Sequence, residues 1–129
     1  MRDPEDVVLA EVGAALPASR ALPDVLEIGC GTGALAERLR AAHPGAALIA
    51  TDLSARMVGL TAARGIPTRV MDAAAMDVPT ASYDVVVAAW VLEHLPDLDA
   101  GLAEVRRVLR PGGSLVAVTL GEEHVADLR

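Results

Sequence analysis

Three glycines at alternate positions, Gly29, Gly31 and Gly33, follow an apolar run that contains one acidic residue, Glu27. Glycine is needed where the backbone takes a positive φ or comes within contact distance of a ligand. The segment after the glycines has helical spacing, and a helix N-terminus offers backbone N–H groups to a ligand. A purely structural turn needs one glycine rather than three, so the pattern favours a ligand-binding turn.

The charge beside this turn narrows the class of ligand. Gly29, Gly31 and Ala34 satisfy the loose dinucleotide-binding pattern G-x-G-x-x-A, so the glycines alone leave NAD open. However, Glu27 lies close to the expected place of a pyrophosphate, and its carboxylate would oppose that anion. An adenosyl cofactor with an ammonium and a sulfonium and no phosphate matches this charge better.

Two further acids stand where apolar runs end. Asp52 lies about 20 residues beyond the glycines and can accept hydrogen bonds from both ribose hydroxyls, in either cofactor class. Asp72 can accept a hydrogen bond from an adenine amino group while the backbone of Ala73 donates to the ring. Each acid also has a structural interpretation, because Asp52 can cap a helix and Asp72 can begin an Asx-turn.

Three single residues have competing interpretations. A helix N-terminus would lower the pKa of the Cys30 thiol, but no base is apparent nearby, so a small residue that fits a tight turn is preferred. Met57 either contacts a ligand or belongs to the core. His94 follows the fourth apolar run, where a histidine can take a proton from a substrate hydroxyl or amine. Its alternative role is to shape the loop with Glu93 and Pro96.

Short apolar segments predict the strands that position these residues. They are 25–28, 46–51, 68–71, 83–89 and 114–120. Helices are expected over about 4–16, 33–42, 54–65, 97–109 and, from its first residues, 122–129. The run Arg110-Pro111-Gly112-Gly113 predicts a turn. Strands that alternate with helices form a parallel sheet covered on both faces, which binds ligands at the carboxyl ends of its strands.

Length, composition and charge limit the number of domains, the classes of partner and the cellular location that are expected. The 129 residues fit one domain, 1–129, and the formal charge of −7 argues against nucleic acid or an anionic membrane as a partner. No apolar run approaches the roughly 20 residues that span a bilayer, and the N-terminus lacks a signal-peptide pattern, so a cytoplasmic protein is expected. We expect His43 and His124 at the surface near helix ends, and no spacing of His, Cys, Asp and Glu indicates a metal site.

Together, these motifs resemble the class I S-adenosylmethionine-dependent methyltransferases. The resemblance rests on EIGCGTG at 27–33, Asp52, Asp72-Ala73, YDVVV at 83–87 and EVRRVLRPGGSL at 104–115. Each motif alone is weak, whereas their order and spacing over 24–119 are specific. The family has a Rossmann-like, doubly wound α/β sheet of order 3-2-1-4-5-7-6 in three layers, with S-adenosylmethionine across the ends of strands 1 to 4.

The resemblance also implies roles for individual residues. Glu27 and the glycine turn would hold the methionine part of the cofactor. Asp52 and Leu53 would bind the ribose, and Met57 would contact one face of the adenine. Ala89, just past the fourth strand, would contact the amino acid end. The residues implied to bind the cofactor are Glu27, Gly29, Cys30, Gly31, Thr32, Asp52, Leu53, Met57, Asp72, Ala73 and Ala89.

The implied reaction is transfer of a methyl group to a nucleophile, in which the protein aligns the reactants and no acid or base is obligatory. The segment after 83–89 lacks the Asn-Pro-Pro-Tyr and Pro-Cys elements of enzymes that methylate nucleic-acid bases, so a small-molecule acceptor is expected. The alternative is a non-catalytic module that binds the cofactor or a partner, since a fold does not determine a function.

The sequence departs from the family pattern at its C-terminus. The pattern continues with a helix and a two-stranded hairpin, whereas this sequence stops at Arg129. We therefore expect a sheet of order 3-2-1-4-5 without strands 6 and 7, in which 115–120 is an exposed apolar edge. Either the chain is truncated or another chain covers this edge, which favours a homo-oligomer through strand 5.

Overall fold

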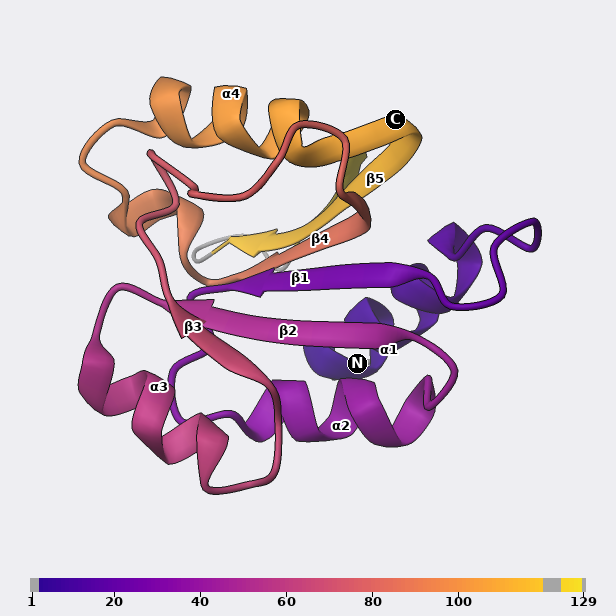
Figure 1. Ribbon diagram of the computed structural model, residues 1–129, viewed down its shortest axis with the longest axis horizontal. Helices are drawn as coiled ribbons and strands as arrows, with labels where there is room; N and C mark the ends of the chain where they lie inside the picture. Colours follow the sequence, from indigo (N-terminus) through magenta and orange to yellow (C-terminus); the bar gives the residue numbers. More distant parts are fainter. Residues whose placement is uncertain (1–2, 120–123, 129) are drawn as a thin grey trace.

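A six-stranded sheet of order β3-β2-β1-β4-β5-β6 forms the centre of the computed structural model, which describes residues 3–119 and 124–128 (Figure 1). The strands are β1 (Asp24–Ile28), β2 (Ala47–Asp52), β3 (Thr68–Val70), β4 (Tyr83–Ala89), β5 (Leu109–Thr119) and β6 (His124–Leu128). The first five pair in parallel, and β6 pairs antiparallel with β5. The predicted order 3-2-1-4-5 is confirmed.

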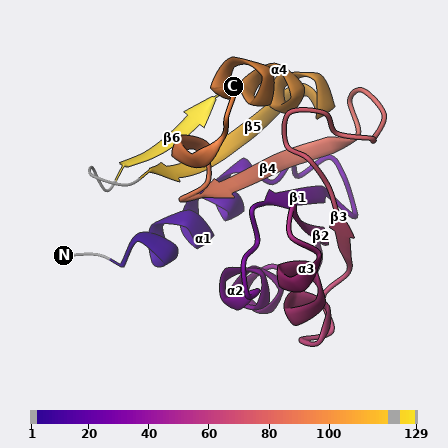
Figure 2. The same ribbon diagram turned by 90° about the vertical axis from the view of Figure 1, so that its left-hand side faces the viewer.

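Helices cover both faces of the sheet. They are α1 (Pro4–Ala15), α2 (Ala34–Ala42), α3 (Ala55–Ala62) and α4 (Leu98–Val108), with a 3₁₀ turn, η1 (Leu92–His94). Figures 1 and 2 show α1, α2 and α3 on one side of the sheet and α4 on the other, which confirms the three-layer arrangement. The side chains of Asp3, Ser54 and Asp97 cap α1, α3 and α4.

Side chains of the central strands alternate between two apolar layers. Val25 and Val85 pack with residues of α1 and α2, whereas Leu26 and Val86 pack with residues of α4. Because successive strand residues point to opposite faces, Glu27 lies on the same side of β1 as Val25, beneath α1 and α2. The fold therefore places a carboxylate inside an apolar layer.

The C-terminal prediction of a helix over 122–129 is wrong for residues 124–128, and residues 122, 123 and 129 lie outside the described residues. Residues His124–Leu128 form β6, which pairs with β5 in the register Thr119↔His124 to Leu115↔Leu128. An eight-residue helix is marginal on its own, whereas the edge of β5 offers a row of unpaired backbone groups. The exposed edge expected at β5 is therefore covered by the chain itself, which removes the reason for expecting a homo-oligomer there, and His124 begins a strand rather than ending a helix.

The predicted turn at 110–113 is a bulge within β5. Pairing with β4 shifts from Tyr83↔Leu109 to Val85↔Ser114, so four residues of β5 lie opposite Asp84. Asp84 is buried and accepts hydrogen bonds from Arg20 Nε (3.2 Å), Arg110 Nη1 (2.8 Å) and the backbone N of Asp24 (2.8 Å). This polar network joins the amino ends of β1 and β4, and the glycine turn lies at the other end of these strands.

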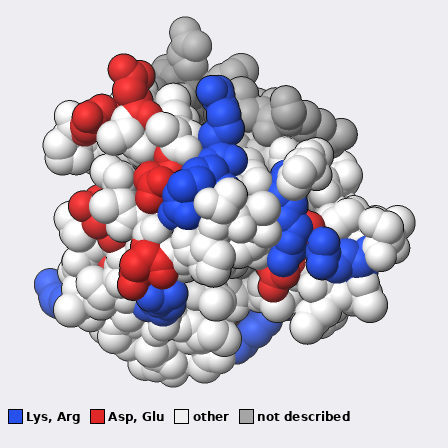
Figure 3. All heavy atoms as spheres, turned by 45° about the horizontal axis from the view of Figure 1, so that its top comes forward, with Lys and Arg blue, Asp and Glu red and all other residues white. Residues whose placement is uncertain are grey.

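Charges on the α4 side of the molecule are interspersed. Figure 3 shows basic and acidic side chains next to one another over this face. Ion pairs of the structure include Arg107 with Glu104 (2.7 Å) and Arg69 with Asp77 (2.6 Å). Among the described residues, no helix is both long and apolar enough to cross a membrane.

Candidate cofactor site

The turn between β1 and α2 requires glycine at all three positions. Gly29, Gly31 and Gly33 have φ values of +69°, +56° and +92°. A Cβ at Gly29 would lie 2.6 Å from Cγ2 of Val91, and one at Gly33 would lie 2.8 Å from Oγ1 of Thr61. At Gly31, a Cβ would meet no described atom within 4 Å. Open space at Gly31 is where a ligand can approach the backbone.

Residues of β2 and α3 hold the turn in place. Asp52 Oδ2 accepts a hydrogen bond from the backbone N of Gly31 at 3.0 Å. Thr61 Oγ1, buried on α3, donates to the Gly31 carbonyl at 3.0 Å, and Arg64 Nε donates to the Thr32 carbonyl at 2.9 Å. Thr61 and Arg64 support the turn from about 30 residues away in the sequence, and no motif marks them.

A cavity of about 340 Å³ lies at the carboxyl ends of β1 and β2. It brings together six of the residues predicted to form the site, namely Gly29, Asp52, Leu53, Asp72, Ala73 and His94. Leu53 is 70% exposed, so an apolar surface stands beside the Asp52 carboxylate. An aromatic base can pack against the apolar surface, and the hydroxyls of a ribose can donate hydrogen bonds to the carboxylate.

A second cavity of about 150 Å³ lies on the other side of Gly29, which lines both spaces. It contains four further predicted residues, Glu27, Cys30, Thr32 and Ala89. Glu5 of α1 and Trp90, neither of which was predicted, also line it. An extended ligand can pass over Gly29 from the larger cavity into the smaller one.

Glu27 gives the smaller cavity its electrostatic character. The residue is only 2% exposed, and its Oε1 atom has no hydrogen-bond partner among the described residues. Burial, reinforced by the charges of Glu5 and Asp52, raises the pKa of Glu27 from 4.5 to about 8. Burying a polar oxygen without a partner is costly, so the cavity is complementary to a donor, above all a cationic one.

These features fit the S-adenosylmethionine expected from the sequence. Glu27 offers an unpaired carboxylate oxygen for an ammonium, and the open space at Gly31 lets the cofactor contact the backbone. Asp52 Oδ1 accepts from the backbone N of Ser54 at 2.9 Å, yet each carboxylate oxygen has a second lone pair for a ribose hydroxyl. A pyrophosphate would instead meet the buried acid.

The pKa of the Cys30 thiol is raised in the structure, whereas a helix N-terminus would lower it. The thiol is buried and lies 3.3 Å from Thr61 Oγ1. Burial raises its pKa, and the hydrogen bond with Thr61 offsets this only in part. A lowered pKa, which was the alternative for this residue, is therefore not found, and Cys30 packs as a small residue inside the turn.

The structure places the other candidates less centrally. Met57 lies in the first turn of α3, outside the residues that line the two cavities, so its contact with adenine stays a prediction. Asp72 is exposed and forms the Asx-turn that was its alternative, with Oδ1 accepting from the backbone N of Ala74 at 2.9 Å. The His94 side chain is 66% exposed at the rim of the larger cavity, and its Nε2 lies 4.0 Å from Glu93 Oε1.

His43 is more buried than expected. It follows α2, is half-buried, and its Nε2 lies 2.9 Å from the Leu9 carbonyl of α1. It therefore ties two helices together. In the described part of the chain, no group of three or more His, Cys, Asp and Glu residues could hold a metal ion.

Trp90 has unusual backbone geometry. Its φ is +57°, a left-handed conformation that bulky residues rarely adopt, and its backbone N donates to the Val118 carbonyl at 2.7 Å. This hydrogen bond holds the backbone of Trp90 at the end of β5, and the residue lines the smaller cavity. The sequence contains no signal for this geometry, because it depends on pairing with β5.

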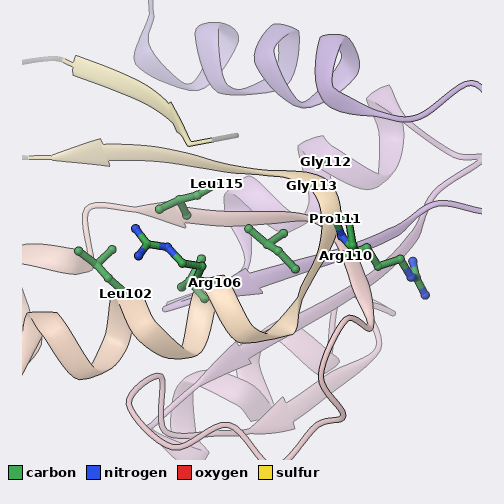
Figure 4. Close-up of a pocket in the computed structure, with 9 residues that line it drawn as sticks. Leu102, Arg106, Arg110, Pro111, Gly112, Gly113 and Leu115 are labelled. Carbon is green, nitrogen blue, oxygen red and sulfur yellow. The ribbon is translucent and has the colours of Figure 1, made fainter.

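A third cavity, of about 460 Å³, is larger than these two and lies elsewhere. It is between α4 and the first part of β5, where Leu102 and Arg106 point from the helix toward the strand (Figure 4). None of its lining residues belongs to the glycine turn or the strand ends. Volume alone is therefore a poor guide to the functional site in this protein.

Comparisons with known proteins agree with this geometry. The family described as "Methyltransferase domain" matches residues 26–117. The malonyl-[acyl-carrier protein] O-methyltransferase of Hahella chejuensis is 40% identical over 109 residues, which cover 81% of this chain and 39% of that protein. The chain spans less than half the length of the curated relatives it matches.

Solved structures show the same fold. The YcgJ protein of Bacillus subtilis matches with a TM-score of 0.74 and 25% identity over 88% of this chain and 50% of its own. Phosphoethanolamine N-methyltransferase 2 of Haemonchus contortus, in complex with S-adenosyl-L-methionine, matches with a TM-score of 0.74 and 25% identity over 88% of this chain and 28% of its own. With the match over 26–117, the chain belongs to the methyltransferase domain family, within the class I S-adenosylmethionine-dependent methyltransferases.

Proposed function

We propose that this chain binds S-adenosylmethionine across the two joined cavities and transfers its methyl group to a nucleophile on a small molecule. The observation that carries the proposal is the buried carboxyl of Glu27, just before the glycine turn, whose Oε1 atom has no hydrogen-bond partner among the described residues. Burial keeps this carboxyl protonated up to about pH 8 in the free protein, and an ammonium beside it would favour its ionised form, whereas a phosphate would oppose that form. The family membership and the residues at the strand ends support the same cofactor.

Each end of the cofactor has its own set of residues in this proposal. The larger cavity takes the adenosyl part, with Asp52 accepting from the ribose hydroxyls and Leu53 against an apolar face. Asp72 and Ala73 border the same space, where the adenine edge would lie. The smaller cavity takes the amino acid part beside Glu27 and Ala89.

When bound, the cofactor supplies an activated methyl group on a sulfonium. The protein contributes position and exclusion of water, and holding reacting atoms at roughly 3 to 3.5 Å is worth several kcal/mol. Gly29 stands between the two cavities, so the turn sets how the two ends of the cofactor are oriented. The carboxylate of Asp52 fixes this turn through Gly31.

The acceptor is proposed to be a small molecule. Relatives are named as a malonyl-[acyl-carrier protein] O-methyltransferase and a ubiquinone biosynthesis O-methyltransferase, which modify oxygen nucleophiles. The formal charge of −7 opposes binding of a polyanion such as nucleic acid. Carboxylic acids and phenols are therefore the first acceptors to test.

Calorimetry with three ligands tests the cofactor. We expect S-adenosylmethionine and its demethylated product, S-adenosylhomocysteine, to bind, and NAD to bind at least about tenfold more weakly because its pyrophosphate meets Glu27. Preferential binding of NAD, or no binding of either sulfur compound by folded protein, would overturn the proposal. Cofactor binding without turnover on any acceptor would favour the alternative of a binding module.

His94 is the proposed general base. It borders the larger cavity and is exposed enough to meet an acceptor. With an acceptor found on a panel of carboxylic acids, phenols and amines, we expect His94→Ala to lower kcat by about 100-fold, because general base catalysis typically contributes that much. Affinity for S-adenosylhomocysteine should stay within about twofold. An unchanged kcat would show that His94 only shapes the loop.

A further inference from the structure

A second carboxylate, Glu5 of α1, borders the same small cavity as Glu27. The start of α1 is well defined, because Asp3 caps the helix and Pro4 occupies its first turn. Val8, which is fully buried, anchors the helix against the sheet. The position of Glu5 at the cavity is therefore set by packing and not by a free chain end.

Arg38 of α2 holds Glu5 from one side. Its Nη1 donates to Glu5 Oε1 at 2.9 Å, and the same guanidinium pairs with Asp6 and, at 3.8 Å, with Asp3. The Arg38 side chain is 38% exposed, so this cluster lies at the surface, and only Glu5 among its acids also lines the cavity. One arginine is shared by three carboxylates, which leaves the group negatively charged.

Both glutamates line the smaller cavity, Glu27 from β1 and Glu5 from α1. Glu27 projects from β1 with an unpartnered oxygen, and Glu5 is close enough for its charge to raise the pKa of Glu27. An ammonium has three N–H donors, so a single carboxylate oxygen cannot satisfy it. Two carboxylates beside one cavity can accept two of these hydrogen bonds.

We propose that Glu5 is a binding residue of the cofactor site, which accepts a hydrogen bond from the ammonium of the cofactor's amino acid part together with Glu27. In this arrangement α1 is one wall of the site, and Arg38 orients Glu5. This inference rests on the proposed function, because it requires the amino acid part of the cofactor to lie in the smaller cavity. The competing interpretation is that Glu5 only pairs with Arg38 and fastens α1 to α2.

The test compares Glu5→Gln with Asp6→Asn. Both variants weaken the acidic cluster around Arg38, but only Glu5 lines the cavity. The ligands are S-adenosylhomocysteine and methylthioadenosine, which lacks the amino acid part. Fluorescence of Trp90, the only tryptophan, reports binding because its side chain borders the cavity.

We expect Glu5→Gln to weaken S-adenosylhomocysteine binding about tenfold and to leave methylthioadenosine binding within about twofold, because only a charge-assisted hydrogen bond to the ammonium is lost. Asp6→Asn should change neither affinity by more than about twofold. Glu5→Asp keeps the charge and should retain most of the affinity for S-adenosylhomocysteine.

The results that would contradict the role of Glu5 differ from those that would contradict the proposed function. Equal losses for both ligands, or equal losses in Glu5→Gln and Asp6→Asn, would show that Glu5 acts only by fastening α1 and would overturn the inference. Unchanged affinity of Glu5→Gln for S-adenosylhomocysteine would overturn it as well. If the folded wild-type protein binds neither ligand, the proposed function itself fails, and this inference fails with it.

Discussion

We expect Asp52→Ala to bind S-adenosylhomocysteine at least about 100-fold more weakly than the wild-type protein. Two hydrogen bonds from ribose hydroxyls to a charged oxygen are lost, and each such bond contributes about 1.5 to 3 kcal/mol. The substitution also removes the acceptor for the backbone N of Gly31, which helps to hold the glycine turn. Calorimetry gives the affinity, and thermal denaturation shows whether the variant is folded.

Two further variants interpret that result. Asp52→Asn keeps the size of the side chain and one acceptor oxygen, so its affinity should fall between those of wild type and Asp52→Ala. Asp77→Ala removes an exposed acid that pairs with Arg69 and lies outside both cavities, and it should bind normally. Unchanged affinity in folded Asp52→Ala would remove the assignment of this residue to the ribose.

In the cofactor-free protein, Glu27→Gln is expected to abolish a loss of stability that accumulates as the pH rises from about 4.5 to about 8. The unfolded chain releases the Glu27 proton near pH 4.5, whereas burial in the folded chain raises its pKa to about 8. Between these values the folded state holds a proton that the unfolded state has lost, so the free energy of unfolding falls as the pH rises. The penalty is complete above pH 8 and amounts to at most about 5 kcal/mol.

Urea denaturation of both proteins at pH 5.5, 7 and 9 measures this effect, because the difference between the two curves isolates Glu27 from the other titrating groups. The wild-type protein should lose stability relative to Glu27→Gln as the pH rises. Glu37→Gln, which alters an exposed glutamate of α2, should follow the wild type. Parallel curves for wild type and Glu27→Gln would show that the buried carboxyl has an ordinary pKa.

The sequence by itself determined most of the parallel sheet and the identity of the glycine turn. Runs such as 83–89 are apolar and β-branched, and these local properties favour buried strands. Gly29, Gly31 and Gly33 need positive φ values, which only glycine adopts at little cost, so their spacing alone indicates the turn. Glu27 already indicated a cationic ligand through its charge.

The C-terminal region was decided by tertiary pairing. The segment 124–128 becomes a strand because β5 offers an open edge, and the run 110–113 becomes a bulge because β5 pairs with β4 on both sides of it. Both outcomes depend on partners that are distant in the sequence. Local propensity therefore predicted a helix that does not form at 124–128, and it located the tight turn of the chain at 110–113 without indicating that β5 continues on both sides of it.

Only the tertiary structure decided which residues share the site with the glycine turn. Thr61 of α3 and Arg64, two residues beyond the end of that helix, contact the turn, and Glu5 reaches the same cavity as Glu27 because α1 packs on the sheet. None of these residues belongs to a motif, since a lone glutamate or threonine looks the same in a helix whatever it faces. The absence of a partner for Glu27 Oε1 among the described residues, which carries the proposed function, likewise follows from the burial of Glu27 in the folded chain and not from its residue type.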